Sequence, residues 1–183
     1  MTPPTDDELM ARVREGEQRA FAELYERHRR VVFTFLLRLT GDRRTAEDLL
    51  QETFLRAWRS RGDYRASGQF RGWLFTIARR LTVDWYRREG LQWEGNEEKA
   101  VLLETLASPA GQPDRHAEAR EELGHLQRAL DRLPPAQRET ILLSRFVGLD
   151  SQQIASVTNS TPGAVRVQLH RALAHLRAIL SGP

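Results

Sequence analysis

The sequence predicts an all-α protein with two small helical domains joined by a long flexible linker. Apolar residues recur at steps of three and four along most of the chain, which is the spacing of one helix face. Prolines and glycines cluster between these segments, and no run alternates apolar and polar residues as a half-buried strand would. The 183 residues suffice for one to two small domains. We expect domains at residues 1–89 and 115–183, with an acidic linker at 90–114.

Three helices are expected at the start of the first domain. The first covers roughly residues 6–14, and its three leading acids suit the positive end of a helix dipole. The second covers about residues 17–39 and ends at Gly41, since glycine adopts the left-handed conformation that closes helices. The third begins at Thr45, which we expect to form a capping box with Asp48 three residues later.

The fourth expected helix, residues 70–88, combines an apolar stripe with a basic face. The stripe consists of Phe70, Trp73, Leu74, Ile77, Ala78, Leu81 and Trp85. The other face carries Arg71, Arg79, Arg80, Arg87 and Arg88, with Phe75 and Tyr86 among them. Arginine offers a planar fork of donors to phosphates and bases, and aromatic rings stack on unpaired bases. Taken alone, the pattern fits an ordinary core helix with a solvated basic face equally well.

The second domain begins after a segment rich in glycine, proline and acids. Residues 90–114 form a longer connection than is usual inside a compact domain. A helix through Leu126 and Leu130 should stop at Pro134. Another should cover residues 136–147, closed by Gly148.

The last 33 residues predict a helix-turn-helix. Its packing positions are held by Ile154, Ala155 and Val165. Asn159 suits a left-handed turn, Thr161 is a natural N-cap, and Pro162 fits the first helical position. The residues expected to face outward, toward a DNA major groove, are Arg166, Val167, Gln168, His170 and Arg171. No acid follows Asp150, which favours DNA binding over a plain helical hairpin.

Charge alternates along the chain although the net charge is only +3. Residues 55–88 hold nine Arg against two acids, net +7; residues 89–122 hold three basic groups against nine acids, net −6. Residues 123–183 hold seven Arg against three acids, net +4. Two basic segments around an acidic connector indicate two contacts with a polyanion, since phosphate neutralisation supplies most non-specific affinity for nucleic acids.

Composition argues against disulfides, metal sites and membrane insertion. The chain has no cysteine, which excludes disulfides and thiolate metal sites, and its five histidines are dispersed. No apolar run approaches the roughly 20 residues that span a bilayer, and the N-terminus lacks the features of a secretion signal. We therefore expect no metal, cofactor or membrane insertion, and a cytoplasmic location.

With both domains considered, the chain resembles the extracytoplasmic-function sigma factors of the bacterial sigma-70 family. The motifs FAELY (21–25), AEDLLQETF (46–54) and WLFTIAR (73–79) resemble sigma region 2. The motifs LPPAQRE (133–139), QIA (153–155), GAVR (163–166) and LHRA (169–172) resemble region 4. Their order and separation make the resemblance specific.

The resemblance implies partners and site residues. The clamp helices of the largest subunit of core RNA polymerase would bind Asp48, Leu49, Gln51, Glu52 and Phe54. The minus-ten promoter element would be recognised and opened by Tyr64, Arg65, Gln69, Phe70, Arg71, Trp73, Arg79, Arg80 and Arg87. The minus-thirty-five element would be read by Thr161, Gly163, Arg166, Val167, Gln168, His170 and Arg171, beside a contact with the flap of the second-largest subunit. An anti-sigma factor commonly restrains the family, and the sigma factor itself is no enzyme.

Some positions depart from the family pattern. Arg80 stands where asparagine is common, and arginine prefers guanine edges or phosphate. Thr158 and Ser160 replace apolar turn residues, so we expect a less tightly packed turn. Val167 suits contact with a thymine methyl group and Gln168 suits an adenine.

Two other functions compete with this one. A freestanding helix-turn-helix regulator has no need for an acidic docking side beside an Arg/Trp helix. A nucleic-acid enzyme would need paired carboxylates, a phosphate-binding glycine loop or an activated nucleophile, and the sequence offers none of these constellations.

Overall fold

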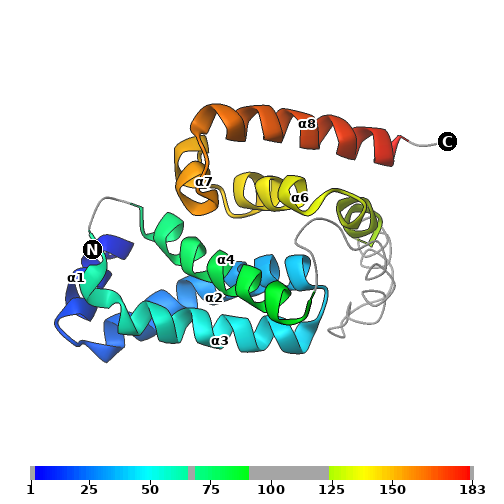
Figure 1. Ribbon diagram of the computed structural model, residues 1–183. Helices are drawn as coiled ribbons and strands as arrows, with labels where there is room; N and C mark the ends of the chain where they lie inside the picture. Colours follow the sequence, from blue (N-terminus) through cyan, green and yellow to red (C-terminus); the bar gives the residue numbers. More distant parts are fainter. Residues whose placement is uncertain (1–2, 66–68, 91–123, 182–183) are drawn as a thin grey trace, which may run out of the picture.

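The computed structural model describes residues 3–65, 69–90 and 124–181, and within these ranges it is helical with no strand, which confirms the all-α class (Figure 1). The first group of helices consists of α1 (Asp6–Arg14), α2 (Gln18–Thr40), α3 (Arg43–Arg59), the short 3₁₀ helix η1 (Arg61–Asp63) and α4 (Phe70–Arg88). The second group consists of helical residues 124–131, α6 (Pro135–Ile141), the π-helical turn η3 (Leu142–Phe146), α7 (Ser151–Thr158) and α8 (Pro162–Leu180). Apart from residue 90, the predicted linker lies outside the described residues.

Helix α1 starts in a capping box that was not predicted. The Thr5 hydroxyl accepts a hydrogen bond from the Glu8 backbone N–H at 3.2 Å, and the Glu8 carboxylate accepts one from the Thr5 backbone N–H at 2.7 Å. Asp6, Asp7 and Glu8 occupy the first turn, as predicted. The start of α1 is therefore fixed by both charge and reciprocal hydrogen bonding.

The boundary between α2 and α3 is partly as predicted. Helix α2 ends before Gly41, whose φ of 68° is left-handed. The predicted capping box of Thr45 with Asp48 is wrong, because α3 begins two residues earlier with Asp42 as its N-cap. The Asp42 carboxylate accepts the hydrogen bond from the Thr45 N–H at 2.7 Å, so Thr45 contributes its backbone to the cap.

The apolar stripe of α4 is buried or partly buried, but one residue assigned to its basic face was misplaced. Phe75 has no solvent exposure, and its ring meets that of Phe35 edge-on at 5.1 Å between centroids. The cause is that α4 is covered from two directions: α2 and α3 pack on one side, and α7 packs on another. A face that looked solvated from helical spacing alone is therefore interior.

The helix-turn-helix prediction is confirmed in its local chemistry. Asn159 has φ 54°, the Thr161 hydroxyl accepts from the Ala164 N–H at 3.2 Å, and Pro162 opens α8. The Thr158 hydroxyl donates to the Ile154 carbonyl at 2.8 Å and lies 3.0 Å from the Ser160 hydroxyl. The polar turn residues thus bond to each other and to the backbone instead of filling a core.

Helix α6 begins at Pro135, one residue before the predicted start, and passes directly into η3. There the Val147 N–H donates to the Leu142 carbonyl at 2.9 Å, an i to i+5 bond that widens the last turn. Gly148 then adopts φ 80°, as its predicted role as a helix terminator requires.

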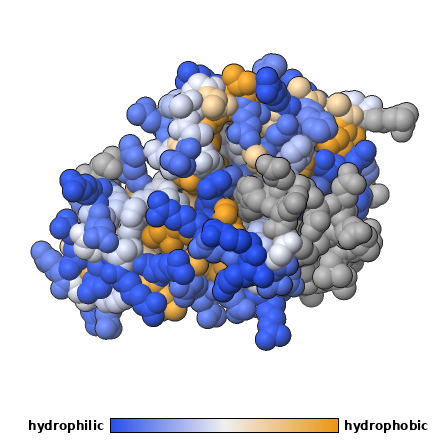
Figure 2. Space-filling view, viewed as in Figure 1, coloured by the Kyte–Doolittle hydropathy of each residue, from blue (hydrophilic) through white to orange (hydrophobic). Residues whose placement is uncertain are grey.

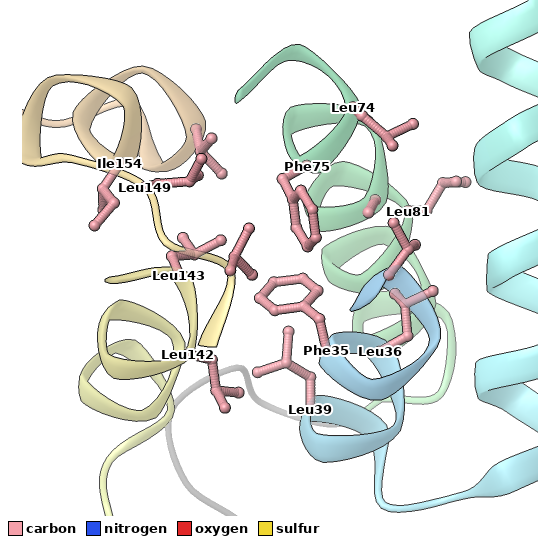
Figure 3. Packing of buried hydrophobic residues seen from close by; sticks show 14 of the residues in the cluster. Phe35, Leu36, Leu39, Leu74, Phe75, Leu81, Leu142, Leu143, Leu149 and Ile154 are labelled. Atoms are coloured by element: carbon pink, nitrogen blue, oxygen red, sulfur yellow. The ribbon is translucent and has the colours of Figure 1, made fainter. Parts of the chain in front are cut away.

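The two helical groups share one continuous hydrophobic core. Figure 3 shows Phe35 and Leu39 of α2 and Phe75 of α4 pointing toward Leu142 and Leu143 of η3. Phe35, Phe75 and Leu143 are all fully buried. The placement of the two domains could not be predicted from the sequence, and the structure packs them directly against each other.

The corrected cap of α3 is open to a direct test. We expect Asp42→Ala to lower the free energy of unfolding by about 1 kcal/mol, because it removes the acceptor for the Thr45 N–H. Thr45→Ala keeps that N–H and should change stability by less than half as much. Urea unfolding followed by circular dichroism measures both; a larger loss in the Thr45 variant would contradict the assignment.

Candidate nucleic-acid and polymerase interfaces

The outer face of α8 presents the predicted minus-thirty-five residues to solvent. Arg166, His170 and Arg171 are exposed, Val167 is 52% exposed, and Gln168 is half-buried. Two more predicted contacts, Thr161 and Gly163, are exposed at the start of the helix. In Figure 1, α8 lies on the side of α6 and α7 that faces away from α2–α4.

Helix α8 is held in place by the apolar side chains of its inner face. Val165 and Ala172 are fully or almost fully buried, and Leu176 is 9% exposed. Leu169 and Ile179 pack against the same core and are partly buried. A rigid inner face lets the outer side chains keep a fixed spacing along the helix.

The polar residues predicted to contact the minus-ten element differ in their solvent exposure and in their contacts. Arg65, Gln69, Arg80 and Arg87 are exposed, and Arg87 pairs with Asp84 at 2.9 Å. Arg71 is exposed too, but one of its terminal nitrogens lies 3.4 Å from the Val147 carbonyl oxygen in the second group. Four predicted minus-ten residues are therefore accessible to a ligand. A fifth, Arg71, contacts the second helical group.

Two of the predicted base-contacting aromatic residues face the core in this structure. Tyr64 and Phe70 are each 3% exposed, while Trp73 packs beside them and is half-buried. The Tyr64 hydroxyl donates a hydrogen bond to the Asp7 carboxylate of α1. Burial together with this bond raises the pKa of Tyr64 far above its ordinary value. Helix α1 thus covers a ring that the sequence placed at the DNA surface.

Arg79 is bound to the second helical group by an ion pair. Its Nε donates to Oε1 of Glu139 at 2.7 Å. The Glu139 side chain is 3% exposed and that of Arg79 is 21% exposed. Burial raises the pKa of Glu139, and the adjacent Arg79 charge opposes that effect. In the sequence, Glu139 appears only as the last residue of the LPPAQRE motif. Its ion pair with Arg79 could not be predicted, because the two residues lie 60 positions apart.

The outer face of α3 carries the predicted docking acids and one apolar residue that was missed. Asp48 and Gln51 are exposed, and Glu52 is partly exposed and accepts from Arg56 at 2.8 Å. Leu55 is 49% exposed and follows Asp48 by seven residues, so the two share a face. The seven-residue spacing between Asp48 and Leu55 can be read from the sequence, so this shared face could have been predicted.

The other two predicted docking residues of α3 are buried. Leu49 is 5% exposed and Phe54 is 4% exposed, and the Phe54 ring packs edge-on against that of Tyr25 at 4.8 Å. They hold α3 against the core and do not present their side chains outward. Beside the outer face, α3 and α4 border an open groove lined by Thr45, Asp48, Leu49, Glu52, Arg56, Leu81, Asp84, Trp85, Arg87 and Arg88.

Comparison with known proteins identifies the family. The Sigma-70 region 2 family matches residues 24–92, and the Sigma-70 region 4 family matches residues 123–176. The RNA polymerase sigma factor CarQ of Myxococcus xanthus is 37% identical over 172 residues, which cover 93% of this chain and 95% of CarQ. The chain belongs to the extracytoplasmic-function sigma factors of the sigma-70 family. The sigma factor NccH of Alcaligenes xylosoxydans xylosoxydans is 33% identical, covering 98% of this chain and 97% of NccH.

Solved structures of sigma factors share the fold. The sigma factor CnrH, in complex with the cytosolic domain of CnrY, matches with a TM-score of 0.71 and 28% identity over 96% of both chains. The sigma factor RpoE of Bartonella quintana, in complex with the anti-sigma factor NepR, matches in fold with a TM-score of 0.69 at 23% identity, covering 87% of this chain and 96% of RpoE.

Figure 2 shows a largely hydrophilic face with small, separate hydrophobic patches. In the ranges that the structure describes, no three His, Cys, Asp or Glu side chains are grouped to hold a metal ion. None of the helices in those ranges is long and apolar enough to cross a membrane.

A buried histidine joins α1 to the core of region 2. The ring of His28 is 4% exposed; its Nε2 lies 2.8 Å from an Asp6 carboxylate oxygen, and its centroid lies 5.1 Å from that of Phe70. Burial lowers the pKa of His28, Asp6 opposes that shift, and Arg71 and Arg27 add to it. The neutral ring is therefore the form that the folded protein favours.

This burial predicts a pH-dependent stability. A lowered histidine pKa gives stability that is fully present above the unfolded value of about 6.5 and is lost as the pH falls through the folded pKa. The difference in unfolding free energy between wild type and His28→Gln should therefore shrink from pH 7.5 to pH 5.5. Urea unfolding at both pH values measures it, and a difference that grows at pH 5.5 would show that the Asp6 charge dominates.

Proposed function

We propose that this sigma factor binds core RNA polymerase through α3, opens the minus-ten element with residues around α4, and reads the minus-thirty-five element with α8. The observation that carries the proposal is the exposed, basic, acid-free outer face of α8 behind a tight turn. The protein is not itself an enzyme, because the polymerase supplies the chemistry. It acts in the cytoplasm, where bacterial polymerase and DNA meet.

The functions are divided along the chain. We assign polymerase docking and the minus-ten element to residues 1–89, and the minus-thirty-five element to residues 115–183. Between them, residues 90–114 are the acidic connector that would pass through the polymerase. The support is the order of the two family matches and the charge change between them.

Polymerase docking on α3 combines charge with one apolar anchor. Asp48 and Glu52 supply negative charge, and Leu55 supplies exposed apolar surface one turn further along. Interfaces draw most of their binding energy from a few well-packed residues surrounded by near-neutral contacts, and we assign Leu55 to that central position. Leu49 and Phe54 contribute by fixing the helix.

Minus-ten contacts would come from side chains that differ in accessibility. Arg65, Gln69, Arg80 and Arg87 are already exposed and suit phosphate or base-edge contacts. The Tyr64 and Phe70 rings would reach a base only after α1 shifts, since Asp7 holds the Tyr64 hydroxyl.

Base reading on α8 would use two different chemistries. The exposed Val167 suits a thymine methyl group, and the amide of Gln168 suits an adenine edge. Arg166 and Arg171 add phosphate contacts that position the helix.

An anti-sigma factor is the expected regulatory partner. The support comes from CnrH and RpoE, whose structures were solved with CnrY and with the anti-sigma factor NepR. The likeness to CnrH extends over 96% of each chain, so a comparable binding surface is expected here.

Transcription from total genomic DNA tests the function without the choice of a particular promoter. Purified core polymerase should initiate at a discrete set of sites only when this protein is added, and mapped RNA 5′ ends should share minus-ten and minus-thirty-five elements. A freestanding regulator would instead bind duplex DNA alone and leave core polymerase without new start sites.

The docking proposal predicts the effect of one exposed leucine. Leu55→Asp should weaken core polymerase binding at least tenfold, because it replaces the apolar anchor with a charge. Leu180→Asp on α8 is the matched control, since Leu180 is 47% exposed and lies outside the docking face. Binding of a labelled protein to core polymerase, followed by fluorescence anisotropy, measures both; equal affinities would refute the role of Leu55.

A further inference from the structure

The hydrogen bond between α1 and Tyr64 gives promoter opening a residue outside the predicted site. We propose that Asp7 is a positioning residue for the minus-ten element: it fixes Tyr64, and through that ring it fixes the exposed Arg65 and Gln69. This inference rests on the minus-ten role proposed above for Arg65 and Gln69. Asp7 lies well before residue 24, where the region 2 match begins, so the family match gives it no role.

The Tyr64 ring is held by contacts with three different side chains. It is 3% exposed, and its centroid lies 5.9 Å from that of Phe70 and 5.1 Å from that of Trp73, both edge-on. Its hydroxyl donates a hydrogen bond to the Asp7 carboxylate. The ring contacts tie the end of η1 to the start of α4, and the hydrogen bond ties both to α1. Hydrogen bonds to an ionised acceptor are the stronger kind.

Helix α1 is itself firmly anchored. Leu9 and Val13 have no solvent exposure, and Met10 is 1% exposed. Moving three such side chains into water would cost far more free energy than one hydrogen bond contributes. The helix packs on both α2 and η1. Asp7 therefore has a fixed place relative to the core, and it holds Tyr64 as a brace and not as a removable cover.

The two neighbouring acids of α1 bind different elements. The Asp6 carboxylate lies 2.8 Å from Nε2 of His28 and 3.2 Å from a terminal nitrogen of Arg27, both in α2. Asp7 instead binds Tyr64, in the connection between α3 and α4. Adjacent carboxylates on one helix turn thus offer a matched pair, of which only one is bonded to the connection proposed to meet DNA.

The residues that the brace would position are exposed and adjoin the buried rings. Arg65 follows Tyr64 directly, and Gln69 precedes Phe70. A long exposed side chain loses conformational entropy when it binds, and a backbone that is already fixed lowers the total cost. The buried rings therefore aid DNA binding without touching DNA, because they set the points from which Arg65 and Gln69 reach out.

The direction of one substitution separates a brace from a cover. If α1 only covered a base-stacking ring, Asp7→Ala would release Tyr64 and increase promoter opening. For a brace, Asp7→Ala should lower opening about tenfold, the order expected for a lost hydrogen bond to a charged group. Permanganate reactivity of unpaired thymines, with saturating core polymerase at a mapped promoter, measures it.

A second variant and a double variant test the coupling. Tyr64→Phe keeps the ring and removes only the hydroxyl, so it should lower opening as much as Asp7→Ala does. The double variant should be no worse than either single variant, because both remove the same hydrogen bond. Asp7→Asn keeps an oxygen that accepts from the Tyr64 hydroxyl and should restore most of the opening.

Two controls distinguish positioning from general damage. Asp6→Ala removes the neighbouring carboxylate and should leave opening unchanged, with circular dichroism showing that helix content is kept. Affinity for core polymerase, followed by fluorescence anisotropy, should be the same for wild type, Asp7→Ala and Tyr64→Phe, because the proposed docking face lies on α3.

The outcomes separate this inference from the proposed function. Increased or unchanged opening in Asp7→Ala overturns the inference, and so does an equal loss in Asp6→Ala. A loss of core polymerase affinity that matches the loss of opening overturns it as well, since the role would then be structural. Wild-type protein that opens no promoter overturns the proposed function instead.

Discussion

Burial of α4 from two directions is the constraint on which the rest of the structure depends. Phe75 meets Phe35 on one side, and the core continues into Leu143 of the second group. A fully buried phenylalanine contributes roughly 1.5–3 kcal/mol relative to an exposed one, so this packing outweighs the few polar contacts around it. Because the same helix carries the arginines proposed to meet DNA, stability and promoter binding compete for its surface.

The predicted site residues divide into two kinds, exposed and buried. Arg80, Arg87 and the outer residues of α8 project into solvent and are available without rearrangement. Tyr64, Phe70, Leu49 and Phe54 are built into the core, where they position their helices. We therefore expect the exposed residues of a sigma factor motif to touch a partner and the buried ones to fix the helix that carries them.

Signals carried within a few residues were predictable from the sequence, and contacts between distant segments were not. Asn159, Thr161 and Gly41 act through their own backbone or the next turn, so their roles could be read directly. The N-cap of α3 was missed because Asp42 and Thr45 both have capping chemistry and lie three positions apart. Phe75 was misread because helices from both halves cover α4, and Glu139 was overlooked because its partner Arg79 lies in the other half of the chain. The acids on the outer face of α3 could be predicted, but the exposed Leu55 on the same face was overlooked.

The pattern of helix packing has a consequence for how the chain folds. Helices α1, α2, α3 and α4 each pack on a neighbour in sequence, and α7 packs on α8, so both halves are built mainly from local contacts that form quickly. The α4–α7 contact joins segments about 80 residues apart and carries the larger loop-closure entropy. Because domains generally fold as units from the N-terminus during synthesis, we expect the first bundle to form before α7 leaves the ribosome and the two halves to dock afterwards.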